Sequence, residues 1–135
     1  MGYYVHINVC FACDNNEGVA EIAARHAPSI KHREAKFFLD TLSSRTGTNP
    51  GGKGGLSTWG IVGNYVRGAD FVQALLPFWN DLIGCEDGPN DFEHVLVFEE
   101  AEQSANAKAF EIEKDEFSGE IKVTEHACTF RWNQH

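Results

Sequence analysis

The chain has 135 residues, 42% of them hydrophobic, which is the composition of one globular domain and not of a disordered segment. Its net charge of −9 argues against non-specific nucleic-acid binding, and its apolar runs are shorter than the roughly 18 residues of a membrane span. The opening residues lack the basic segment and apolar stretch of a secretory signal, so we expect a single domain, 1–135, in the cytoplasm.

The first half of the chain predicts one strand followed by two helices. Apolar and polar residues alternate over 3–10, as in a half-buried strand. Asp14 and Glu17 have the spacing of a capping box and begin a helix that ends before Pro28. A second helix is expected over about 31–45, where four apolar residues recur at helical spacing: Ala35, Phe38, Leu39 and Leu42.

The second half predicts a strand, a buried helix and three further strands. Residues 56–66 favour a strand, because Gly60 and Gly63 oppose a helix. The segment 71–83 is apolar on two adjoining faces, which is typical of a buried helix, and Pro77 should kink it or restart it. Strands follow over about 93–100, 106–113 and 120–131, with turns at 104–106 and 118–119.

This order of elements, β-α-α-β-α-β-β-β, predicts an α+β fold of two layers. The sheet should be mostly antiparallel, since its last three strands follow one another as a meander. Helices should then cover one face of the sheet.

The charges are unevenly distributed along the chain. Residues 81–120 hold 13 of the 20 acids and only two bases, whereas 25–53 is basic. One interpretation is a dipolar molecule whose acidic end attracts a basic partner protein. The other is that the acids keep a small protein soluble.

Cys10 and Cys13 form a Cys-x-x-Cys where the first strand is predicted to lead into a helix. The positive end of that helix could lower the pKa of the Cys13 thiol. The simpler interpretation is a pair of packed thiols without a cofactor, because cysteine is among the most buried residue types.

The placement of this pair resembles thioredoxin-like oxidoreductases and soluble heavy-metal chaperones. The resemblance implies thiol-redox chemistry or a metal such as zinc bound by Cys10 and Cys13. Zinc would need two further ligands. The candidates are Cys85, Cys128, His6, His94 and His126.

The glycine-rich segment 47–55 resembles the phosphate loop of nucleotide-hydrolysing enzymes, Gly-x-x-x-x-Gly-Lys-Ser/Thr. Gly54 stands where that loop carries the hydroxyl residue that holds Mg²⁺, and a helix is predicted before it where a strand is required. We therefore expect a surface loop without a nucleotide site.

The two ends of the chain resemble short phage-encoded accessory proteins. The resemblance rests on the opening Met1-Gly2-Tyr3-Tyr4 and on the Glu-rich segment 95–104. It implies an accessory protein in the host cytoplasm, with no assigned chemistry.

The sequence carries no catalytic signature, so the first hypothesis is a non-catalytic binding or inhibitor protein without a cofactor. It would act through its acidic meander on a basic host protein, and an edge strand of the meander offers a pairing site for a partner or a second copy, giving a homodimer. The alternative is a metal-binding or thiol-redox protein built on Cys10 and Cys13. The predicted partner-binding residues are Glu99, Glu100, Glu102, Glu111 and Glu113.

Overall fold

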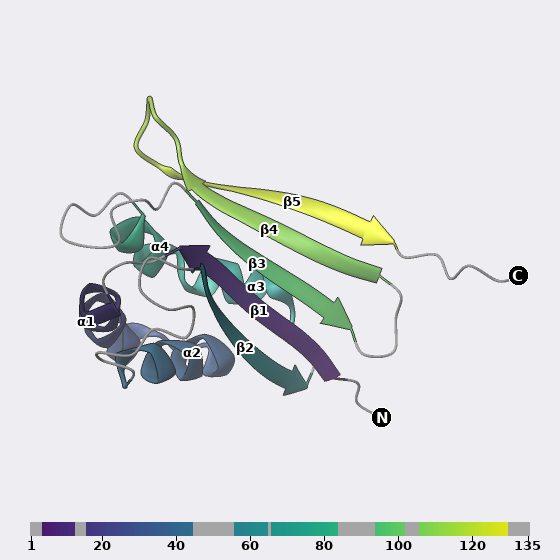
Figure 1. Ribbon diagram of the computed structural model, residues 1–135, viewed down its shortest axis with the longest axis horizontal. Helices are drawn as coiled ribbons and strands as arrows, with labels where there is room; N and C mark the ends of the chain where they lie inside the picture. Colours follow the sequence, from purple (N-terminus) through teal and green to yellow (C-terminus); the bar gives the residue numbers. More distant parts are fainter. Residues whose placement is uncertain are drawn as a thin grey trace, which may run out of the picture.

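The computed structural model describes residues 4–12, 16–44, 56–64, 66–83, 94–101 and 106–129. Strands β1 (Tyr4–Ala12), β2 (Leu56–Asn64), β3 (His94–Ala101), β4 (Asn106–Lys114) and β5 (Ile121–Thr129) form one antiparallel sheet in the order β2-β1-β3-β4-β5. Figure 1 shows the helices on one side of that sheet. They are α1 (Asn16–His26), the 3₁₀ turn η1 (Ala27–Ser29), α2 (Arg33–Ser43), α3 (Gly68–Ala74) and α4 (Leu76–Leu82). The predicted α+β architecture is confirmed, and the elements follow the predicted order except that two short helices replace the single helix expected between β2 and β3.

The strands bury every second residue against the helices, because successive side chains of a strand point to opposite faces. In β1 the buried row is 4% exposed or less at each position: Val5, Ile7, Val9 and Phe11. The row continues across the sheet through Val95 and Val97 of β3 and through Phe110 and Ile112 of β4. The opposite rows carry the polar residues of β1 and the glutamates of β4.

Helix α2 buries the four residues that the sequence periodicity selects, Ala35, Phe38, Leu39 and Leu42. It begins two residues later than expected. His32 caps it, since its Nδ1 accepts a hydrogen bond from the backbone N–H of Ala35 at 3.2 Å.

The apolar segment after β2 forms two short helices, because Pro77 restarts the chain as a first-turn residue of α4. The two helices remain tied together. The fully buried indole of Trp79 donates a hydrogen bond from Nε1 to the carbonyl of Val72 at 3.0 Å. The rings of Phe38, Phe78 and Trp79 pack with centroids 5.2 to 6.2 Å apart, so α2 joins the same core.

Helix α3 begins at Gly68, three residues before the predicted start. The reason is a contact from a distant strand: the backbone N–H of Gly68 donates to Glu99 Oε1 of β3 at 2.8 Å. A carboxylate at a helix start satisfies one of its unpaired N–H groups. Local periodicity carries no information on such a contact.

Candidate binding surface

The predicted acidic residues do not form one surface. Glu99 lies on the helix side of the sheet and caps α3 through Gly68, whereas its neighbour Glu100 points to the other side. Glu111 and Glu113 lie on the same side as Glu100. Residues that are paired across two strands share a face, and the register of β3 and β4 pairs Glu100 with Ala107 and Leu96 with Glu111. Glu102 lies outside the described residues.

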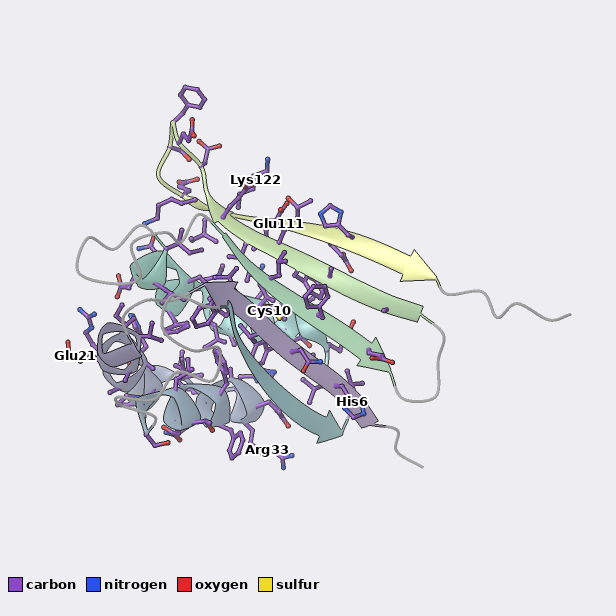
Figure 2. All side chains as sticks on the ribbon, viewed as in Figure 1. His6, Cys10, Glu21, Arg33, Glu111 and Lys122 are labelled. Carbon is purple, nitrogen blue, oxygen red and sulfur yellow. The ribbon has the colours of Figure 1, made fainter. Side chains whose placement is uncertain are left out.

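The side of the sheet that faces away from the helices is called the open face here. Figure 2 labels four of its residues, His6, Cys10, Glu111 and Lys122. The described side chains of the open face are His6, Asn8, Cys10, Leu96, Phe98, Glu100, Ala107, Ala109, Glu111, Glu113, Lys122, Thr124 and His126.

Several acids of the meander have basic neighbours. His126 Nε2 lies 3.8 Å from Glu111 Oε1, and on the helix side Lys108 Nζ lies 3.3 Å from Glu125 Oε1. Lys122 stands directly opposite Glu113 in the register of β4 and β5. The acidic character of the meander is therefore greatest beyond these pairs, in the turn that joins β4 to β5.

That turn, residues 115–120, is called the acidic tip here. It contains Asp115, Glu116 and Glu120, and it is held by its own hydrogen bonds. Asp115 Oδ1 accepts from the backbone N–H groups of Phe117 and Ser118, both at 2.9 Å. The Asp115 backbone donates to the Glu120 carbonyl at 2.8 Å and accepts from the Gly119 N–H at 2.9 Å.

Two features of the acidic tip follow from this hydrogen bonding. The bonds from Ser118 and then Phe117 stabilise the charged carboxylate and lower the pKa of Asp115 below its ordinary value of 3.8. Gly119 adopts φ of 71°, which an L side chain rarely accepts, so the predicted turn at 118–119 is confirmed.

Phe117 is the exposed aromatic of the acidic tip. Its side chain is 97% exposed, compared with 61% for Phe37 on α2 and 40% for Phe98 on β3. Phe117 is not among the binding residues predicted from the sequence. The signal was present, since Asp115, Ser118 and Gly119 are turn-forming residues at turn spacing, and a residue between them cannot reach the core.

The base of the acidic tip is fastened to the helix layer. Lys114 Nζ donates a hydrogen bond to the backbone carbonyl of Asn80 in α4 at 3.0 Å. Figure 1 shows the turn between β4 and β5 projecting beyond the end of the neighbouring strand β3. The acidic tip is thus a projecting segment with a defined backbone.

The surroundings of Cys10 bear on the hypothesis of a metal or thiol-redox site. Cys10 is a half-buried free thiol on the open face, and burial raises its pKa above the ordinary value of 9.0. His6 lies four residues away on the same strand face, about 13 Å at strand rise, too far to share a metal ion with Cys10. His126 is three strands away. Cys13 and Cys85 lie outside the described residues, as do the side chains of His94 and Cys128.

Within the described ranges, no group of three metal-ligating side chains comes together. The glycine-rich segment 47–55 is also outside them, so the expectation of a loop without nucleotide remains a prediction. None of the described helices has both the length and the apolar character needed to cross a membrane.

No protein-family model, curated protein or solved structure matches this chain. The assignment of function therefore rests on the geometry of the surface described above.

Proposed function

We propose that this chain is a non-catalytic binding protein that engages a protein with a basic surface through its acidic tip. Phe117 is the central apolar contact, and Glu116 and Glu120 supply the surrounding negative charge. This surface differs from the one that the sequence suggested. Glu100, Glu111 and Glu113 lie on the open face, and Glu99 has a structural contact of its own.

The observation that carries the proposal is the 97% exposure of Phe117 on a hydrogen-bonded turn. Aromatic residues dominate the energetics of protein interfaces, where they fill pockets on the partner. A turn whose conformation is already set loses little conformational entropy on binding. Carboxylates around the ring favour a pocket with a rim of Lys and Arg and accelerate the encounter.

The resemblance of the chain ends to short phage-encoded proteins extends this proposal. It implies that the partner is a host protein, met in the host cytoplasm, and that binding inhibits or modulates it. Only the sequence supports this extension.

The proposal predicts that a partner captured on immobilised protein depends on Phe117. Phe117→Ala should weaken capture at least tenfold, because a buried aromatic contact typically contributes 2 kcal/mol or more. Glu116→Lys should slow association, and raising the salt concentration should do the same for the unmodified chain, since exposed charges are screened over about 8–10 Å. Quantitative mass spectrometry of the captured proteins measures the loss of binding, and the amount captured as a function of exposure time measures the rate of association.

Two matched controls are built into the chain. Phe37→Ala removes a second exposed phenylalanine from α2, and Glu21→Lys reverses an exposed acid on α1. Both should leave capture unchanged. If the same proteins bind equally well to Phe117→Ala, or if Phe37→Ala weakens capture as much, the acidic tip is not the binding surface.

A further inference from the structure

The centre of the open face is apolar, although no described element covers it. Phe98 is 40% exposed, and Cys10, Leu96, Ala107 and Ala109 are half-buried around it. A contiguous apolar patch with a polar rim is characteristic of an interaction site. This surface is separate from the acidic tip, and its role does not depend on the function proposed above.

The register of the strands defines two central rows on the open face. One row runs Asn8, Phe98, Ala109, His126, and the next runs Cys10, Leu96, Glu111, Thr124. When two copies pack face to face, a two-fold axis can lie between the two sheets. If this axis runs perpendicular to the strands at the level of Val97, it places each row of one copy over the other row of the second copy.

We propose that the open face packs against the same face of a second copy of this chain, about this two-fold axis. Phe98 then lies over Leu96 of the second copy, and Leu96 lies over its Phe98, so the two largest apolar side chains of the patch cover one another. Sheets that pack face to face hold their strands within about 30° of each other, which keeps the two β3 strands together. The interface is isologous, as in most homodimers.

The charges of the open face are compatible with this pairing. About the same axis Glu111 faces Ala109 of the second copy and Glu113 faces its Ala107, as the register requires. Glu100 faces the register position of His94. Each of these glutamates thus meets a position without an acid, and opposed like charges, which would be unfavourable, do not arise.

The size of the face is also sufficient. Five strands about 4.8 Å apart and about nine residues long span roughly 24 by 30 Å, or on the order of 700 Å². Specific protein interfaces bury about 600–1,000 Å² per partner, so a face of this size lies within the usual range. An acidic surface disfavours nucleic acid as the occupant, since binding there would not release counterions.

The test is the mass of the full chain in solution, measured by sedimentation equilibrium as a function of concentration. The unmodified chain should reach twice the 15.0 kDa of one copy. Phe98→Glu should raise the dissociation constant of the dimer at least about thirtyfold, as for an interface residue of the central kind. Phe37→Glu makes the same change on the exposed side of α2 and should leave the dissociation constant within about threefold.

A second measurement requires no substitution. The Cys10 thiol lies within the proposed interface, so its alkylation, followed on its own peptide by mass spectrometry, should slow as the protein concentration rises. This readout holds even if Phe98→Glu, checked by circular dichroism, fails to fold.

Three results would overturn the proposal. They are a monomer at every concentration, a dimer that survives Phe98→Glu in a folded chain, and Cys10 alkylation that does not depend on concentration. A dimer that pairs through the edge of β5 would survive Phe98→Glu. Phe117→Ala should remain dimeric, which separates this proposal from the binding function of the acidic tip.

Discussion

At the scale of single residues, contacts between distant parts of the chain decide what each side chain can do. Glu99 and Glu100 are adjacent and chemically identical. One caps α3 on the helix side of the sheet, and the other is exposed on the open face. Reversing the charge of Glu99 would therefore disturb the fold and would not report on partner binding.

Gly68 also depends on contacts with distant strands, and the direction of its effect on stability can be measured. Replacing glycine by alanine in a helix normally stabilises a protein by about 0.5–1 kcal/mol. A Cβ at Gly68, however, would lie 2.6 Å from Phe110 Cε2 and 3.2 Å from Glu99 Cβ. We expect Gly68→Ala to lower the free energy of unfolding by about 1–3 kcal/mol, the usual cost of overpacking. Urea denaturation measures it.

Phe110→Leu provides the control for this clash, because it removes the ring that the new methyl group would meet. In that background Gly68→Ala should cost at least about 1 kcal/mol less than it does alone. Equal costs in both backgrounds would show that Phe110 is not the obstacle.

Asp115 predicts a pH dependence of the acidic tip. Its folded-state pKa is lowered, so its contribution to stability is present above the ordinary value of 3.8 and is lost as pH falls through the lower folded value. Asp115→Asn keeps an acceptor for the turn but has no charge to titrate. The amide resonances of Phe117 and Ser118, followed by NMR, should shift below pH 3.8 in the unmodified chain and not in the variant.

At the scale of elements, a partly buried side-chain hydrogen bond joins α1 to α4. His26 Nε2 lies 2.5 Å from Asp81 Oδ2, with side-chain exposures of 18% and 39%. The His26 ring also meets Phe78 of α4 edge to face, at 6.3 Å between centroids. This contact connects the last turn of α1 to α4 within the helix layer.

A double-mutant cycle of His26→Gln and Asp81→Asn should give a coupling free energy of about 1 kcal/mol, because a hydrogen bond that is partly shielded from water contributes more than an exposed one. The exposed pair Lys36 and Asp40, at 3.4 Å on α2, serves as comparison and should couple by no more than about 0.5 kcal/mol. Equal coupling free energies in the two cycles would mean that partial burial does not strengthen the contact between His26 and Asp81.

At the scale of the whole molecule, the sheet order separates two surfaces. β1 lies inside the sheet between β2 and β3, although both partners follow it at long sequence separation. This pairing brings Cys10 beside Leu96 and so creates the apolar centre of the open face. The hairpin of β4 and β5 is local and carries the acidic tip at one end. A dimer through the open face would present two such tips.

Periodicity and turn chemistry by themselves determine the elements of this protein. Helical spacing in α2 selects its four buried residues, Pro77 divides the apolar segment into α3 and α4, and Ser118 and Gly119 mark the turn of the last hairpin. These signals are local, since they depend on the conformation of a few neighbouring residues, and they suffice for the α+β class.

The tertiary structure alone decided the order of the strands, the capping of α3 at Gly68 by Glu99, and which of Glu99 and Glu100 faces the helices. A two-residue period shows that alternate side chains of β3 share a face, but it does not show which face the helices cover. That choice depends on pairings between β1 and strands far along the chain. The predicted acidic residues are therefore divided between the two sides of the sheet, and the apolar centre of the open face follows only from those pairings.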